Sequence, residues 1–366
     1  MWRKPKETSG GSGRQARALR LAANAAAVIP PLGRLRRQRD ELAKAVSGSE
    51  SRINALELEL AAAGHVFLGA DQPTSGLRLQ IGPVPGTVVL RTRHEFDAVV
   101  AAATEHRGYE EAFSASVIGQ DSWCYPAYCQ ACGAGTPTAG DWLFSDGEQP
   151  NYRERLICPT CGLNSRQRFM AALVRRLEPA MPASLPLYLY EQITPFFDWT
   201  TQKVDDRIVI GSEYLAYHFV GGSVTDGIRH EDALALSFGD NSLAGIVSTD
   251  VFEHVPDIDL ALREACRVIA PGGRLLFSIP FHSSSDTTTR RAELNDGIVT
   301  ELLPAEYHGN PVSAKGSLVF YDHGWDIFER CRRAGFSDAY GLGYWSALYG
   351  YIGNGIQLTF IAEKSG

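Results

Sequence analysis

Ser248-Thr-Asp-Val-Phe-Glu-His-Val-Pro-Asp opens the stretch that decides the fold, and Ala270-Pro-Gly-Gly-Arg-Leu-Leu-Phe-Ser-Ile-Pro-Phe closes it. The pattern predicts a buried strand over 244–248, then an amphipathic helix, then a second strand over 274–279. The helix must end near Pro271, because proline cannot continue it and the two following glycines supply a left-handed turn. Two strands joined by such a helix lie parallel. We therefore predict a doubly wound α/β sheet with its chemistry at the carboxyl ends of the strands.

The same residues resemble a known family. Asp250-Val-Phe-Glu-His-Val-Pro-Asp and Leu262-Arg-Glu-Ala-Cys-Arg-Val-Ile-Ala-Pro-Gly-Gly-Arg-Leu resemble the post-core motifs of class I S-adenosylmethionine-dependent methyltransferases of the type 11-like, small-molecule group. The resemblance implies a seven-stranded, mostly parallel sheet with an antiparallel last pair, and S-adenosylmethionine as cofactor. The other strands expected in this sheet include 185–190, 207–210, 339–344 and 357–363.

The loop after the first predicted strand departs from the family pattern. Glu191, Gln192 and Thr194 stand where the family has a glycine-rich loop that lets the backbone approach the cofactor. One interpretation is altered contacts, with Glu191 meeting the cofactor's ammonium group. The other is a domain that has lost the cofactor.

Acidic residues downstream match the family's remaining cofactor contacts. Glu213 follows the second predicted strand and is placed to accept hydrogen bonds from the ribose hydroxyls. The resemblance assigns Asp232 and Ala233 to the adenine and adds Asp250 to the cofactor-binding residues. A surface glutamate is the alternative for Glu213.

Methyl transfer to an alcohol requires a positioned nucleophile and a group that takes its proton. His254 is the candidate base, since histidine is the side chain suited to proton transfer near neutral pH, with Asp250 and Glu253 orienting it. His308 is a rival base, because it lies in the insertion 282–317, which the resemblance places over the acceptor site. We expect the acceptor to be a hydroxyl-bearing small molecule or sugar.

Two cysteine pairs predict a metal site. Cys129-Gln-Ala-Cys132 and Cys158-Pro-Thr-Cys161 are each followed by glycine and are separated by 25 residues. Four thiolates at this spacing can close a tetrahedral zinc site with no open position, so the zinc would be structural. Two redox or disulfide pairs are the alternative, and Cys124 is a spare candidate ligand.

The N-terminal part differs from the rest in charge. Residues 1–37 hold nine Lys/Arg and one acidic residue, whereas the whole chain has a net charge of −7. The acidic main body argues against a nucleic-acid partner. No apolar run is long enough for a transmembrane segment and no signal-peptide cleavage region follows, so we expect a cytoplasmic protein.

A 3,4 spacing of mainly apolar residues over 32–63 predicts a coiled coil, and hence a homodimer through this segment. A single helix packed on its own domain has the same spacing. The predicted organisation is a flexible basic arm (1–30), a helix or coiled coil (31–64), a small α/β segment (65–120), a four-cysteine zinc module of the zinc-ribbon type (121–165) and a methyltransferase-like domain (166–366).

These features predict an S-adenosylmethionine-dependent methyltransferase that carries a zinc module. Two alternatives remain at this point. One is a non-catalytic zinc and coiled-coil scaffold with a degenerate methyltransferase fold, and the other is a transferase that uses a different nucleotide-like donor.

Overall fold

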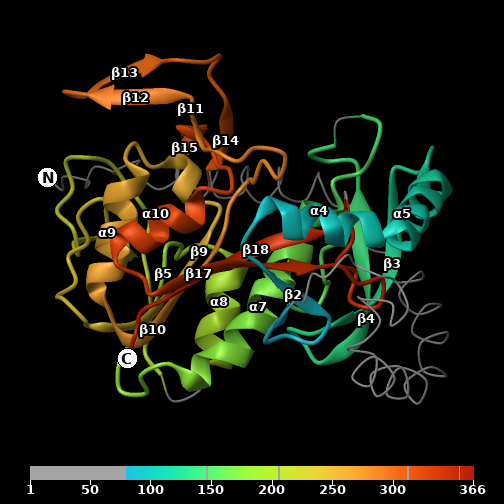
Figure 1. Cartoon of the computed structure of the whole chain (residues 1–366), viewed down its shortest axis with the longest axis horizontal. Helices are drawn as coiled ribbons and strands as arrows, with labels where there is room; N and C mark the ends of the chain where they lie inside the picture. The colour runs from blue at the N-terminus through green and yellow to red at the C-terminus, as the bar shows by residue number, and fades with distance from the viewer. Residues whose placement is uncertain (1–79, 146, 205–206, 311–312, 354) are drawn as a thin grey trace, which may run out of the picture. The chain divides into compact units, whose positions relative to one another are not determined.

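The computed structural model describes residues 80–145, 147–204, 207–310, 313–353 and 355–366 (Figure 1). The predicted basic arm and the predicted coiled coil both lie outside these residues. Among the described residues, no helix has both the length and the apolar character needed to cross a membrane.

Eight strands of the described chain form one sheet, in the order β1-β2-β17-β18-β10-β9-β5-β6. Neighbours among β6, β5, β9 and β10 pair in parallel, and the remaining neighbours pair antiparallel. The predicted doubly wound α/β class is confirmed, with β18 as the antiparallel strand. The strands are β1 (Gln80–Ile81), β2 (Thr87–Leu90), β5 (Leu187–Leu189), β6 (Val209–Gly211), β9 (Leu243–Thr249), β10 (Ile269–Ser278), β17 (Asp338–Tyr344) and β18 (Gln357–Glu363).

The expected count of seven strands is wrong for this sheet, because the hairpin β1–β2 extends it. Residues 87–90 pair antiparallel with the end of β17. This pairing satisfies backbone groups that β17 would otherwise expose at a sheet edge. Beyond β6, a single parallel bridge joins Glu213 and His230.

Helices cover both faces of the sheet. Adjacent residues of each central strand point to opposite faces, so each strand contributes side chains to both cores. Ile246 joins the core beneath α4, α9 and α10, whereas Val247 joins the core beneath α7 and α8. These helices are α4 (Arg93–Ala102), α7 (Ser165–Leu177), α8 (Pro195–Lys203), α9 (Ile258–Val268) and α10 (Ile327–Ala334).

The central β9-α9-β10 unit forms as predicted. Asp257 caps α9 by accepting a hydrogen bond from the Leu260 amide, and the helix ends at Val268. The second strand begins earlier than expected, at Ile269, with an irregularity in register before Arg274 that accommodates the Pro-Gly-Gly segment. This unit brings the turn that contains Asp250, Glu253 and His254 to the carboxyl end of β9.

Two further regions are built from short elements. The cysteine region consists of the hairpin β3–β4 and the helix α6, with α5 packed beside it. The insertion carries the hairpins β12–β13 and β14–β15. Their bounds are α5 (Thr104–Val117), β3 (Ser122–Cys129), β4 (Ala134–Asp141), α6 (Tyr152–Arg155), β12 (Ala292–Asn295), β13 (Ile298–Glu301), β14 (Tyr307–Asn310) and β15 (Ser313–Leu318).

Candidate functional site

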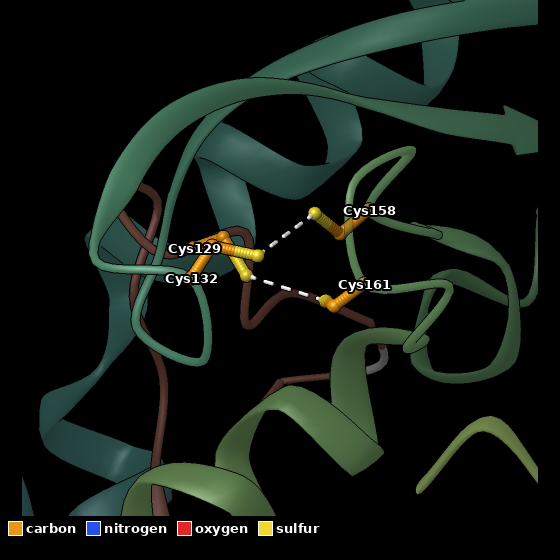
Figure 2. Close-up of side chains that lie close together, drawn as sticks. All are labelled: Cys129, Cys132, Cys158 and Cys161. Carbon is orange, nitrogen blue, oxygen red and sulfur yellow. Dashed lines mark hydrogen bonds between the residues drawn. The ribbon is translucent and has the colours of Figure 1, made fainter. Parts of the chain in front are cut away.

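The four predicted metal ligands converge from two loops (Figure 2). The Sγ atoms of Cys129 and Cys161 are 3.8 Å apart, and so are those of Cys132 and Cys158. Four thiolates about 2.3 Å from one zinc ion would be roughly 3.8 Å from each other in a tetrahedron, so the cluster fits zinc. These separations are far longer than a disulfide bond of about 2.05 Å.

Backbone geometry explains why a glycine follows each pair. Gly133 and Gly162 have φ angles of 71° and 74°, in the left-handed region that favours glycine. Their amides donate to the carbonyls of Cys129 and Cys158, at 2.8 and 2.9 Å, which closes each tight turn. The spare candidate Cys124 lies on β3 and is not part of the cluster.

Glu191 is buried at the carboxyl end of β5. The hydroxyl of Thr249 donates to its Oε1 at 2.5 Å, and the hydroxyl of Thr194 donates to its Oε2. Burial raises the pKa of Glu191 above its ordinary value, against the effect of these two hydrogen bonds. Each carboxylate oxygen retains a lone pair, so an ammonium group would find a poorly solvated acceptor here.

Glu213 supports the loop that replaces the family's glycine-rich segment. Its Oε1 accepts the backbone amides of Gln192 at 2.8 Å and Ile193 at 3.1 Å. The side chain of Gln192 crosses to the β7–β8 hairpin (Val224–Thr225 and Ile228–Arg229), where its amide donates to the Gly227 carbonyl at 2.8 Å. The loop is therefore held by side chains instead of by glycine geometry.

The predicted adenine contacts lie in a turn beside this loop. Asp232 is half-buried, and its Oδ1 accepts the Leu234 amide at 2.9 Å. Ala233 packs on the core. The hydroxyl of Tyr190 is buried without a hydrogen-bond partner among the described residues, which fits a polar ligand in this region. The sequence did not predict a ligand contact for Tyr190.

Asp250 does not contact His254, the residue it was expected to orient. Its carboxylate lies 3.1 Å from both terminal nitrogens of Arg153 and 3.2 Å from Nε of Arg166, and it accepts the Ser278 hydroxyl at 2.7 Å. Burial alone would raise its pKa, but the two guanidinium groups hold the pKa of Asp250 well below its usual range.

Glu154 completes this buried ion network. Both of its carboxylate oxygens accept from Arg166, at 3.0 and 3.1 Å, and it also pairs with Arg153. The network joins α6 and α7, which flank the cysteine loops, to the turn after β9. No local signal in the sequence indicated the roles of Arg153, Glu154 and Arg166, because the carboxylate of Asp250 that joins them lies far away in the chain.

The two candidate bases come together although they lie far apart in the chain. The rings of His254 and His308 are 5.0 Å apart and nearly perpendicular. Glu253 lies between them, with its Oε1 3.6 Å from Nε2 of His254 and 3.7 Å from Nδ1 of His308. The hairpin β14–β15 carries His308 into place beside His254. That the insertion covers an acceptor site stays a prediction.

Aromatic and arginine residues near the C-terminus serve packing. Tyr344 and Tyr351 are buried against Phe169. Arg168 is fully buried and donates to the carbonyl of Gly350 at 3.2 Å. Both tyrosines are therefore core residues.

Residues 215–277 match a family model described as a methyltransferase domain. Over 138 residues the chain is 33% identical to an arsenite methyltransferase from Aquipseudomonas alcaligenes. The match covers 36% of this chain and 35% of that protein, so the chain spans about a third of the length of this curated relative.

Solved structures of methyltransferases are similar at low identity. An S-adenosylmethionine-dependent methyltransferase from Mesorhizobium loti is 16% identical, with a TM-score of 0.34, over 52% of this chain and 96% of that one. DesVI from Streptomyces venezuelae is 15% identical, with a TM-score of 0.34, over 54% and 90%. Residues 215–277, which include β9 and most of β10, are therefore similar to a methyltransferase domain and lie within the α/β sheet described above.

Proposed function

We propose that this protein transfers a methyl group from S-adenosylmethionine to a hydroxyl oxygen of a small molecule or sugar. The observation that carries the proposal is the position of Glu213. It is buried just after β6 and bonded to the loop after β5, in a chain whose residues 215–277 match a methyltransferase domain. An acid at this strand end is suited to the two hydroxyls of a ribose.

Each of three acidic residues at the carboxyl edge of the sheet would bind a different part of the cofactor. Glu213 would hold the ribose through Oε2, because its Oε1 already accepts the Gln192 and Ile193 amides. Glu191 would hold the ammonium group, and Asp232 would accept from the adenine amino group. The absence of the glycine loop is compatible with this arrangement, since side chains support the loop instead.

The transfer itself needs little covalent chemistry from the protein. The bond between the methyl carbon and the sulfonium sulfur breaks, its electron pair stays on sulfur, and the acceptor oxygen bonds to the methyl carbon. The acceptor's proton must leave, and the cluster of Glu253, His254 and His308 offers groups that accept it. Holding donor and acceptor in line provides the remaining acceleration.

We also propose that Cys129, Cys132, Cys158 and Cys161 bind one structural zinc ion. The four ligands leave no position for a substrate, and Cys129 and Cys158 belong to the same core as α7 and α8. The zinc would therefore stabilise the turn between β3 and β4 and the loop between α6 and α7. It would have no part in the chemistry.

Isotope-labelled S-adenosylmethionine tests the acceptor class. The full chain would be incubated with the methyl-labelled donor and a panel of sugars, phenols and aliphatic alcohols, with arsenite included because of the relative's name. We expect label on oxygen and an equal amount of S-adenosylhomocysteine. Label on nitrogen, sulfur or arsenic, with none on oxygen, would contradict the proposed acceptor class.

A further inference from the structure

The carboxylate of Glu253 is buried and lacks a compensating partner. Its side chain is 0% exposed, and neither oxygen makes a hydrogen bond to any described residue. A bare carboxylate in a protein interior is costly, so its charge calls for a cation or a proton. The nearest nitrogens belong to His254 and His308, at 3.6 and 3.7 Å, which exceeds hydrogen-bonding distance.

Both histidines turn a lone pair toward this carboxylate. Nδ1 of His254 is 2.9 Å from the carbonyl oxygen of Leu318, which can only accept, so Nδ1 carries the hydrogen and Nε2 is left as an acceptor. Nε2 of His308 is 3.2 Å from Oε1 of Glu306 and donates to it, which leaves Nδ1 of the neutral ring as an acceptor. When both rings are neutral, three acceptors therefore converge, with no hydrogen between them.

We propose that Glu253, His254 and His308 bind a divalent transition-metal ion, separately from the four cysteines. The three donor atoms lie within 4.8 Å of one another. Donors in a tetrahedral site with bonds of about 2.0 to 2.1 Å are roughly 3.4 Å apart, close to the observed 3.6 and 3.7 Å. The cation would neutralise the buried carboxylate and fill the space between the rings.

The surroundings are those of a metal site. Metal-binding histidines commonly donate their second ring nitrogen to a backbone carbonyl or a carboxylate, as His254 does to Leu318 and His308 does to Glu306. A protonated histidine whose nitrogen lies 3.6 Å or more from Glu253 is beyond hydrogen-bonding distance. A metal ion bound by both rings and the carboxylate accounts for all three groups at once.

Three protein ligands leave one coordination position open, and the side chain of His308 is 31% exposed, so that position reaches solvent. With the ion bound, the three side chains would act as its ligands instead of as bases, and a hydroxyl oxygen coordinated at the open position would lose its proton to water more readily. This role rests on the proposed methyl transfer, whereas the metal site does not. A loaded site in an inactive protein would contradict only the catalytic role.

Metal content of the full chain tests the site. Protein stripped with a chelator and reloaded with Zn²⁺ should hold two ions per chain. Glu253→Gln and His308→Gln should each hold one, and so should Cys158→Ser. His94→Gln, which changes an exposed histidine on α4, should hold two. Glu306→Gln, which removes the charge that supports His308 and pairs with Arg291, should weaken the second ion's affinity about 10- to 100-fold.

Cobalt distinguishes the two sites and reports on folding. Co²⁺-loaded His308→Gln should keep the sulfur-to-cobalt absorption of the thiolate site and lose only the sulfur-free component. Retention of the sulfur bands shows that the variant is folded. If wild-type protein holds a single ion that Cys158→Ser removes, and His308→Gln matches wild type in both metal content and cobalt spectrum, the second site does not exist.

Discussion

Arg166, at the start of α7, and Asp250, at the end of β9, form an ion pair with Nε and Oδ2 3.2 Å apart. Arg153 pairs with the same carboxylate through both terminal nitrogens. The helices that leave the cysteine region are therefore coupled to the turn that carries Glu253 and His254. Zinc, if bound, would help to position that turn through this contact.

Asp250→Asn should destabilise the protein by about 3 kcal/mol, because it leaves two buried guanidinium groups with only Glu154 as a counter-charge. Asparagine is the appropriate substitution, since Asp250 has φ of 53° and asparagine tolerates that region. Denaturant unfolding measures the change. Asp97→Asn breaks an exposed pair with Arg93 and should cost less than about 1 kcal/mol. An equal loss of unfolding free energy in the two variants would contradict the buried ion network.

The same pair predicts a dependence on pH. The folded-state pKa of Asp250 is lowered, so the pair's stabilisation is complete above the ordinary value of 3.8 and is lost as pH falls through the lowered pKa. Between about pH 5 and pH 2, wild-type protein should lose more unfolding free energy than Asp250→Asn. Parallel stability curves for the two proteins would show that Asp250 is not paired.

Removal of the thiolate metal should disrupt the cysteine region. Cys158→Ser should lose one zinc equivalent, and its thermal midpoint should fall, because the metal-binding free energy contributes to folding. Metal analysis and thermal unfolding are the measurements. Cys124→Ser is the matched control, since Cys124 lies on β3 outside the cluster, and it should keep its metal content. Equal metal loss in the two variants would contradict the assignment of ligands.

Glu191→Gln should separate stability from cofactor binding. The neutral amide removes a buried charge whose pKa is raised by burial, so unfolding free energy should stay equal or rise by about 1 kcal/mol. Loss of the charge facing the cofactor's ammonium should weaken S-adenosylmethionine binding about tenfold, which corresponds to about 1.4 kcal/mol. Denaturant unfolding measures the free energy of unfolding, and calorimetric titration measures the affinity for S-adenosylmethionine. Unchanged affinity would exclude Glu191 from the cofactor site.

Local signals in the sequence were sufficient for much of the fold. The alternation of apolar residues around β9 and β10 and the stop at Pro271 predicted the central unit. Asn164 caps α7, and Gly335, with φ of 115°, ends α10; both residue types are common at these positions. The cysteine spacing predicted the cluster, because each pair needs only its own tight turn.

The features that escaped prediction depend on distant pairing. Nothing near residues 87–90 indicates that they extend the edge of β17. Asp250 was expected to orient His254 because the two are close in sequence. Its carboxylate instead pairs with Arg153, which is 97 residues away in the chain. The approach of His308 to His254 likewise depends on how the insertion folds back, which no local pattern specifies.

Calorimetric titration with S-adenosylmethionine tests the central claim most directly. Wild-type protein and the surface variant Glu111→Gln should bind one equivalent with the same affinity. Glu213→Gln keeps an acceptor for the Gln192 and Ile193 amides but loses the charge facing the ribose, so its affinity should fall about 10- to 100-fold. Absence of heat with either S-adenosylmethionine or S-adenosylhomocysteine in wild-type protein, or equal affinity in Glu213→Gln, would contradict the account.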